Sequence, residues 1–158
     1  MSQDNLKTFI ASGLPALKAG GDIAATATDE INNAATDPDL KAALEQGNAT
    51  SKEWRARVER AMQETGAEGD GENAILQAHY EVSKQIMDAA PDAQVKDLGI
   101  IAAGQLALHY WVAAFGTMAA YAKHAGLEQT EQEMTKSVEE AKEADEAHTQ
   151  LAAKILAS

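Results

Sequence analysis

The chain has no cysteine, only three prolines and few aromatic residues: two tryptophans, three tyrosines and two phenylalanines. The absence of cysteine excludes disulfides, thiolate metal sites and cysteine nucleophiles, and it is typical of a reducing compartment. The first five residues lack the basic-then-apolar layout of a signal peptide, so we expect a cytoplasmic protein. With 158 residues, the chain is expected to form one domain, 1–158, with its own hydrophobic core.

Basic residues are also scarce, because 13 lysines and arginines stand against 25 acidic residues, for a formal net charge of −12. Phosphate backbones and anionic lipid surfaces repel such a chain, so we expect it to bind neither nucleic acid nor membranes. One basic cluster occurs at 52–60, interrupted by two glutamates, and we predict that it forms a solvated helix face. Its basic members are Lys52, Arg55, Arg57 and Arg60.

Alanine is the commonest residue, and it has the highest helix propensity. No segment shows sustained period-two alternation with β-branched residues, so we expect an all-α fold without strands. Local signals mark where the helices should begin and end. They are Asp37-Pro38, the glycine-rich loop at 66–71, Ala90-Pro91-Asp92, Gly126, and a capping box formed by Thr130 and Glu133.

The segments between these signals have a helical period. We predict a short helical turn near 3–12, long helices at about 14–34, 38–65, 92–125 and 128–156, and a shorter helix at 72–89. Short links join the long helices except where the chain crosses over through the 72–89 helix. This arrangement predicts a four-helix bundle with an extra short crossover helix.

Residues 98–122 contain no Asp, Glu, Lys or Arg, and the stretch is long enough to cross a bilayer. Gln105 and His109 lie at its middle, which favours a buried helix over a membrane span. We therefore expect it to be the central, most buried helix of the bundle or of a dimer. This predicts a homodimer with Trp111, Phe115 or Tyr121 near the contact, and burial within one chain is the alternative.

Three stretches carry a resemblance to a known family: LGIIAAGQ at 98–105 with the following His109-Tyr110 and AAFGT at 113–117, TDPDLKAALE at 36–45, and EAKEAD at 140–145. The chain resembles the YciE/YciF-type ferritin-like stress proteins over most of its length from about residue 14. The resemblance implies a ferritin-like bundle that is commonly a dimer. In typical members it also implies a carboxylate-rich metal site inside the bundle.

The positions of this metal site are where the chain departs from the family. A di-iron bundle needs several inward carboxylates and histidines, because hard cations require oxygen ligands in a dry core. Most of the family's usual ligands are replaced in the four long helices, where only His109 and Glu140 remain of them. The positions concerned are Gly20-Gly21-Asp22, Gly47, Leu108-His109-Tyr110-Trp111, and Glu140 followed by Ala141. The resemblance therefore supports the fold and argues against the metal centre, and Trp111 is expected to fill part of its space.

A rearranged metal site would have to use the remaining candidate ligands, which are Glu81, His109, Glu140, Asp145 and His148. His109 and Gln105 share a stripe that we predict to face the core, as a buried hydrogen-bonded imidazole or a remnant ligand. Asp145 and His148 have the i, i+3 spacing of one helix face, which we interpret as solvated because acidic residues surround it. Glu81 lies on the short crossover helix, near the position of another family glutamate.

The leading hypothesis is a non-catalytic, ferritin-like stress-associated protein that has lost the di-metal centre. It would have no catalytic residues and no cofactor, and it would act as a homodimer or larger assembly. The alternative is a ferritin-like oxidoreductase or iron-handling protein that binds iron or manganese at a rearranged site. A third hypothesis is an adaptor that binds a basic or helical protein partner through its acidic face.

Overall fold

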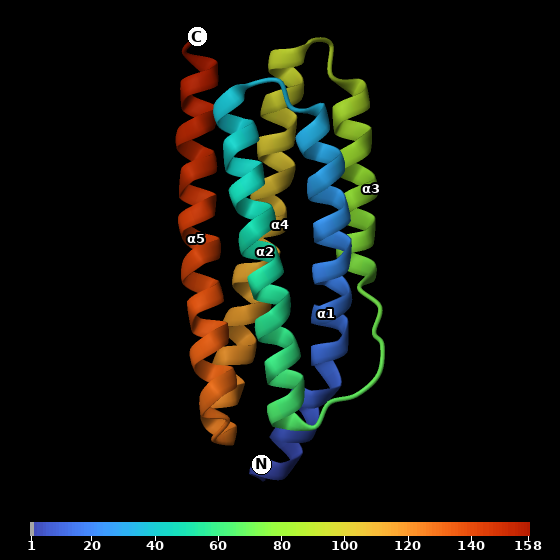
Figure 1. The fold of residues 1–158 in the computed structure, drawn as a ribbon, viewed down its shortest axis with the longest axis vertical. Coiled ribbons are helices and arrows are strands. Elements are labelled where there is room, and N and C mark those ends of the chain that lie inside the picture. The colour runs from blue at the N-terminus through green and yellow to red at the C-terminus, as the bar shows by residue number, and fades with distance from the viewer. Residues whose placement is uncertain (1) are drawn as a thin grey trace.

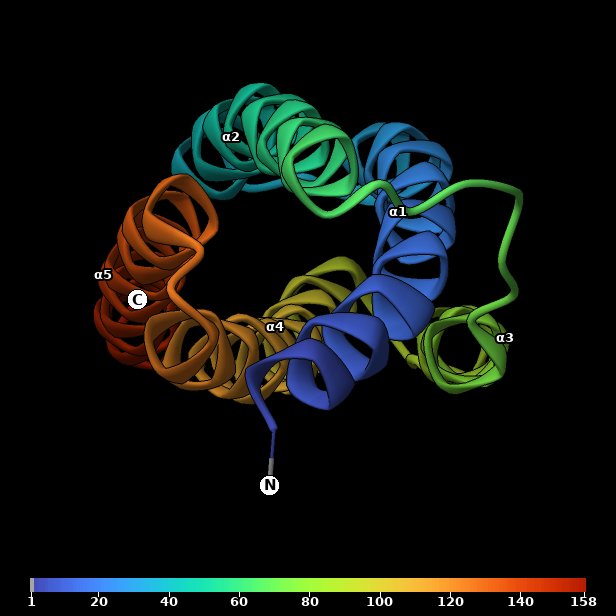
Figure 2. The same cartoon turned by 90° about the horizontal axis from the view of Figure 1, so that it is seen from below.

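The computed structural model describes residues 2–158, which form five helices and no strand. They are α1 (Gln3–Ala34), α2 (Pro38–Thr65), α3 (Ala74–Ala89), α4 (Ala93–Ala125) and α5 (Glu128–Leu156). The helices α1, α2, α5 and α4 surround a common axis, and α3 lies outside them against α1 and α4 (Figures 1 and 2). The predicted all-α four-helix bundle with an extra helix is confirmed.

The connections divide the bundle into two antiparallel hairpins, α1–α2 and α4–α5 (Figure 1). The loop after α2 and the helix α3 return the chain to the opposite end, so α2 and α4 run in the same direction. A bundle with one long crossover is the connectivity of ferritin-like folds. This order places α2 beside α5, where no short loop joins them.

Most predicted helix ends are confirmed by their capping geometry. Asp37 accepts hydrogen bonds from two backbone N–H groups of α2, with Pro38 in the first turn. Gly66 and Gly126 end α2 and α4 in the left-handed conformation, at φ values of 71° and 70°. Such C-terminal caps favour glycine because a side chain strains this backbone geometry.

Two predicted boundaries are wrong. The turn near 3–12 and the helix at 14–34 form one continuous helix, with Pro15 inside it, because the apolar stripe continues in register across the proline. That stripe consists of Leu6, Ile10, Leu14 and Leu17. Thr130 does not cap α5: it is buried, and its backbone N–H and hydroxyl both donate to Glu64 of α2.

The core consists of two clusters along the bundle. One surrounds Trp54, Trp111 and Phe115, and the other surrounds Leu40 and Ile101. The two clusters are separated by a cavity that residues of both help to line. The middle of the bundle is therefore less filled than either of its ends.

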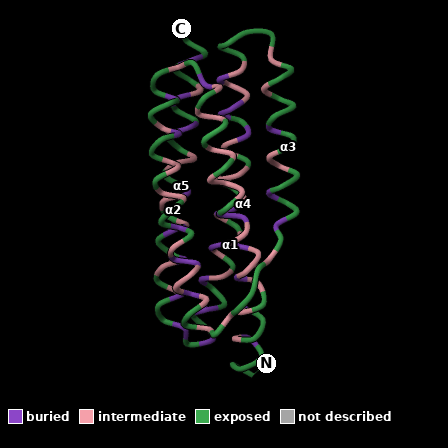
Figure 3. The backbone as a smooth tube through the Cα atoms, turned by 45° about the vertical axis from the view of Figure 1, so that its right-hand side comes forward, coloured by how far each residue is buried: buried purple, intermediate pink, exposed green. Residues whose placement is uncertain are grey.

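As predicted, the helix that contains residues 98–122, α4, has more buried residues than any other described helix, but a large part of it stays uncovered in a single chain. Only 28% of the most apolar 18-residue window of α4 is buried, and Leu106 is 62% exposed. Exposed residues, green in Figure 3, recur along one face of α4 at Ala102, Leu106, His109, Ala113, Thr117 and Ala120. Among residues 2–158, α4 is the one helix long and apolar enough to cross a membrane, by length and composition alone.

Asp97 of α4 binds the loop between α1 and α2. Its carboxylate is 2% exposed and accepts hydrogen bonds from the backbone N–H groups of Thr36 and Asp37, both at 2.8 Å, and from the Thr36 hydroxyl. We predict that Asp97→Ala lowers the free energy of unfolding by about 3 kcal/mol, because these donors lose a charged partner. Asp88→Ala, an exposed site on α3, is the control, and urea unfolding measures both. Equal midpoints for the two variants would contradict this role.

Candidate functional site

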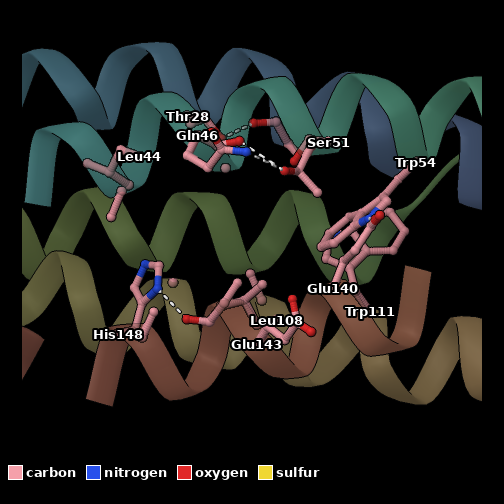
Figure 4. Close-up of a pocket in the computed structure, with 18 residues that line it drawn as sticks. Thr28, Leu44, Gln46, Ser51, Trp54, Leu108, Trp111, Glu140, Glu143 and His148 are labelled. Atoms are coloured by element: carbon pink, nitrogen blue, oxygen red, sulfur yellow. Dashed lines mark hydrogen bonds between the residues drawn. The ribbon is translucent and has the colours of Figure 1, made fainter. Parts of the chain in front are cut away.

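A cavity of about 430 Å³ lies at the middle of the bundle, between α1, α2, α4 and α5 (Figure 4). Its walls are made mainly of small residues, which do not fill the space between the helices. Six of them are Ala43, Gly47, Thr50, Gly104, Ala107 and Ala144. A Cβ atom placed on Gly47 would meet nothing within 4 Å, so this part of α2 faces open space.

An aromatic cluster closes one end of the cavity. Trp111 stacks on Phe115 with ring centroids 5.0 Å apart, and the Trp54 ring lies 6.1 Å from the Trp111 ring. Trp111 is 5% exposed and Phe115 fully buried, so the expectation of either at a dimer contact is wrong. Tyr121, at 38% exposed, remains on the surface. The inward position of Trp111 agrees with its interpretation as a side chain that fills the bundle centre.

Beside this cluster, Arg57 of α2 and Glu140 of α5 form a bidentate ion pair. Arg57 Nη1 and Nη2 donate to the two Glu140 carboxylate oxygens at 2.7 and 2.9 Å, and Trp54 Nε1 donates to the same carboxylate at 2.8 Å. Arg57 also donates to the Ser137 hydroxyl at 3.0 Å. Hydrogen bonding from Arg57, helped by Trp54, lowers the pKa of Glu140 below its ordinary value, although burial opposes this shift.

The buried position of Arg57 corrects the prediction of a solvated basic face at 52–60. Arg57 is 3% exposed, because α2 turns the stripe Trp54, Arg57, Val58 and Ala61 toward the bundle. The other arginines of the cluster follow the prediction more closely. Arg55 and Arg60 are partly exposed and pair with acidic side chains, Asp22 and Glu59 for Arg55 and Glu53 and Glu133 for Arg60.

His109 lies on the outer face of α4, which contradicts the prediction that it faces the core. Its side chain is 69% exposed, and Nε2 is 3.2 Å from an Asp145 carboxylate oxygen. Gln105 Nε2 also donates to Asp145, at 3.2 Å, on the same side of α5. The inward stripe of α4 runs through Ile100, Gly104, Trp111 and Phe115, and His109 lies to one side of it.

His148 is buried, which corrects the interpretation of 145–148 as a solvated face. It is 8% exposed, and its Nδ1 lies 2.8 Å from the Ala144 carbonyl oxygen. Gly104 makes room for the ring, since a Cβ atom there would lie 3.3 Å from His148 Nε2. Despite their i, i+3 spacing, Asp145 turns toward His109 while His148 turns into the cavity.

The five candidate ligands do not come together. Glu81 is exposed on α3 and accepts from Gln77 at 3.2 Å, and His109 and Asp145 pair outside the bundle. Only Glu140 and His148 line the cavity. Within residues 2–158, no group of three or more His, Asp or Glu side chains is arranged to hold a metal ion.

The replaced family positions also fail to fit a dinuclear metal centre. A side chain at Gly20 has no room, because its Cβ would lie 2.6 Å from Asn73 Nδ2 and 3.1 Å from Trp111. Gly47 presents no donor, and Leu108 is apolar. The remaining carboxylate, Glu140, is already bound by Arg57 through both oxygens. A pair of hard cations would therefore have too few oxygen ligands and too little compensating negative charge.

Two contacts of this region were missed by the sequence analysis. The Arg57–Glu140 pair joins residues 83 positions apart, and Glu64 reaches Thr130 from 66 positions away. The spacing of Trp54, Val58 and Ala61 indicates that this face of α2 points inward, and Arg57 belongs to that face. This spacing indicates that Arg57 is buried, but it does not identify the helix that carries its partner.

The fold and site define an all-α bundle with one long crossover and a central cavity flanked by a buried ion pair. The family described as "Domain of unknown function (DUF892)" matches residues 19–158, and the chain belongs to this family. Comparison with curated proteins finds no match.

Two solved structures share the fold. The Escherichia coli stress protein YciF has a TM-score of 0.91 at 18% identity, over 97% of this chain and 98% of that one. The protein described as "YcfI, a putative structural protein from Rhodopseudomonas palustris" has a TM-score of 0.86 at 20% identity, over 91% and 92% of the two chains. The resemblance to YciF-type proteins noted in the sequence is thereby confirmed.

The Arg57–Glu140 ion pair should make the stability of the fold depend on pH. At neutral pH, Arg57→Met should lower the free energy of unfolding by about 2 kcal/mol, because it leaves the partly buried Glu140 carboxylate without its main partner. The folded-state pKa of Glu140 lies below the ordinary 4.5, so the stabilisation is complete above that value. It should be lost as the pH falls below 4.5 toward the folded-state pKa, and the difference between wild type and variant should shrink.

Arg55→Met is the matched control on the same helix, because Arg55 pairs with Asp22 and Glu59 in solvent. It should change the free energy of unfolding by less than about 0.5 kcal/mol. Denaturant unfolding between about pH 3 and 7, a range that brackets carboxyl titration, measures both variants. A deficit for Arg57→Met that stays constant across this range would contradict the assignment.

Proposed function

We propose that this chain is a non-catalytic, stress-associated protein in which an ion pair and an apolar cavity stand in place of a di-metal centre. The observation that carries the proposal is the Arg57 guanidinium bound to both oxygens of Glu140. Arginine stays protonated at all physiological pH values, so this pair supplies a permanent cation inside the bundle. A metal ion that took Glu140 would leave that buried guanidinium with only the Ser137 hydroxyl and the more distant Glu53 carboxylate, 3.6 Å from Arg57 Nε.

The stress association is supported by the relatives rather than by the geometry. The Escherichia coli relative is named a stress protein, and the Rhodopseudomonas palustris relative is named for a structural role. Both names suit a bundle whose interior holds no set of converging carboxylates among the residues described. We extend them to this chain as part of the proposal, with a cytoplasmic location and without nucleic acid as a partner.

A metal-binding function is the second candidate, and one contact favours it. His109 and Asp145 lie 3.2 Å apart on the surface, and together they offer an imidazole and a carboxylate to a cation. Transition-metal sites use more than two ligands. Gln105 also donates a hydrogen bond to the same Asp145 carboxylate. We therefore rank this function below the non-catalytic one.

Ferrous iron titrated anaerobically into the purified protein separates the two candidates. We expect wild type, His109→Ala and Asp145→Ala to give the same weak, salt-sensitive uptake by the acidic surface. Turnover of ferrous iron on exposure to oxygen should equal the rate without protein. Two ions bound per chain in wild type, and lost in either variant, would establish a rearranged site and replace this proposal with the second candidate.

The outer face of α4 supports self-association as part of the proposed function. It contains Ala102, Leu106, Ala113 and Ala120, all exposed, and no charged residue lies between 98 and 122. Two chains with a net charge of −12 each repel one another less across this face, where α4 contributes no Asp, Glu, Lys or Arg and the exposed His109 pairs with Asp145. Phe9 and Tyr121 extend the apolar surface at one end, with ring centroids 6.0 Å apart.

We predict a dimer by light scattering, with a mass near twice the 16.7 kDa of one chain. Leu106→Glu should dissociate it, because a carboxylate at the contact would be buried without a partner. Leu156→Glu is the matched control, since Leu156 is 71% exposed at the far end of α5. A mass of 16.7 kDa for wild type throughout the micromolar range would rule out this dimer.

A further inference from the structure

We infer that the central cavity is a binding site for a small neutral molecule of one or two rings that donates one hydrogen bond to Nε2 of His148. This inference does not rest on the proposed function, because it needs only the cavity and the imidazole. It assigns a ligand class to the central cavity, into which no set of carboxylates converges among the described residues.

The size and walls of the cavity suit such a molecule. At about 430 Å³ it falls within the range of small-molecule sites, and it is about three times the volume of an engineered 150 Å³ cavity that binds benzene. Leu44, Leu108 and Trp111 provide apolar surface, and the remaining wall is mostly alanine and glycine. A smaller space of 110 Å³ adjoins it on the side of α3 and shares Leu44, Gly104 and Trp111.

His148 supplies the polar group that orients the ligand. The Ala144 carbonyl can only accept, so His148 Nδ1 carries the proton, and Nε2 of the neutral ring is an acceptor. The side chain is 8% exposed, and Nε2 makes no hydrogen bond to residues 2–158, but it remains accessible from the cavity. An N–H or O–H donor bound in the cavity would therefore take the place of water at this acceptor. Figure 4 shows His148 and Leu44 pointing toward each other across the space.

The charges around the cavity exclude anionic ligands. Glu140 and Glu143 both line it, no Lys or Arg does, and Arg57, which binds Glu140, is already paired. An anion would meet these carboxylates without a free cation, whereas a neutral donor has no such penalty. The cavity opens between α2 and α5, where Gln46, Glu143 and Ala147 are exposed, so a ligand can enter without unfolding the bundle.

Indole and benzothiophene are the probes, because they have nearly the same shape and only indole carries an N–H donor. Isothermal titration calorimetry should show one molecule of either bound per wild-type chain. The ratio of the indole to the benzothiophene affinity should fall about five-fold in His148→Phe, the loss expected for one hydrogen bond. Comparing ratios removes the difference in hydrophobicity between the two probes.

Gly47→Leu places a side chain in the open space beside α2 and should abolish binding of both probes without lowering the thermal midpoint. Ala49→Leu, an exposed position on the same helix, should bind them as wild type does. No binding by wild type, or binding retained in Gly47→Leu, overturns the site. An unchanged affinity ratio in His148→Phe overturns the role of His148. Neither result alters the iron titration, which tests the proposed function separately.

Discussion

The arrangement of the bundle interior depends on the ion pair between Arg57 and Glu140, which joins α2 to α5. No short loop connects these two helices. Trp54 and Ser137 complete its hydrogen bonds, so the guanidinium is buried without being left unsatisfied. Similar polar contacts continue toward the N-terminal end of α5, where Arg60 pairs with Glu133 at 2.7 Å and Glu64 accepts a hydrogen bond from Thr130. Hydrogen bonds and ion pairs therefore join α2 and α5 at several levels of the bundle.

This arrangement explains why the middle of the bundle is open. Below the cavity, Arg57 and the aromatic cluster set the spacing of α2 and α5, and above it Leu40 and Leu151 close the second core cluster. Between these levels α2 and α5 present Gly47, Thr50 and Ala144, which are too small to meet across the gap. Protein interiors are close-packed, so a cavity of this size either lowers the stability of the folded protein or is filled by a ligand.

The sequence predicts the secondary structure of this protein well, because the relevant signals are local. Asp37-Pro38, Gly66 and Gly126 end or begin helices through groups within a few residues of one another. The error at Pro15 shows the limit of a local rule, since the apolar stripe of α1 keeps the helix continuous through the proline. The lengths of the helices and of the links between them also predicted the four-helix bundle with its crossover helix, and the resemblance to the family implied the same fold.

The orientation of the site residues was harder to predict, because successive residues in a helix are about 100° apart and a small phase error moves a side chain from core to solvent. The residues of α4 are apolar on every side, so their spacing does not indicate which side of the helix faces the core. His109 was therefore predicted to face inward, although it is exposed. On α5 the acidic neighbours of His148 suggested solvent, while the glycine on the facing helix that admits its ring is 44 positions away. Arg57 was misassigned for the same reason, because Glu140 lies on another helix.

Glu140 is the carboxylate that remains at the family's metal positions, and the Arg57 guanidinium binds both of its oxygens, so we propose that this family member has no dinuclear metal centre. Elemental analysis of protein purified without chelator, expressed as metal ions per chain, tests this proposal most directly. We expect only traces of iron and manganese, which high salt removes, because the acidic exterior alone would hold them. Two ions per chain that persist through high salt would show that a dinuclear centre exists.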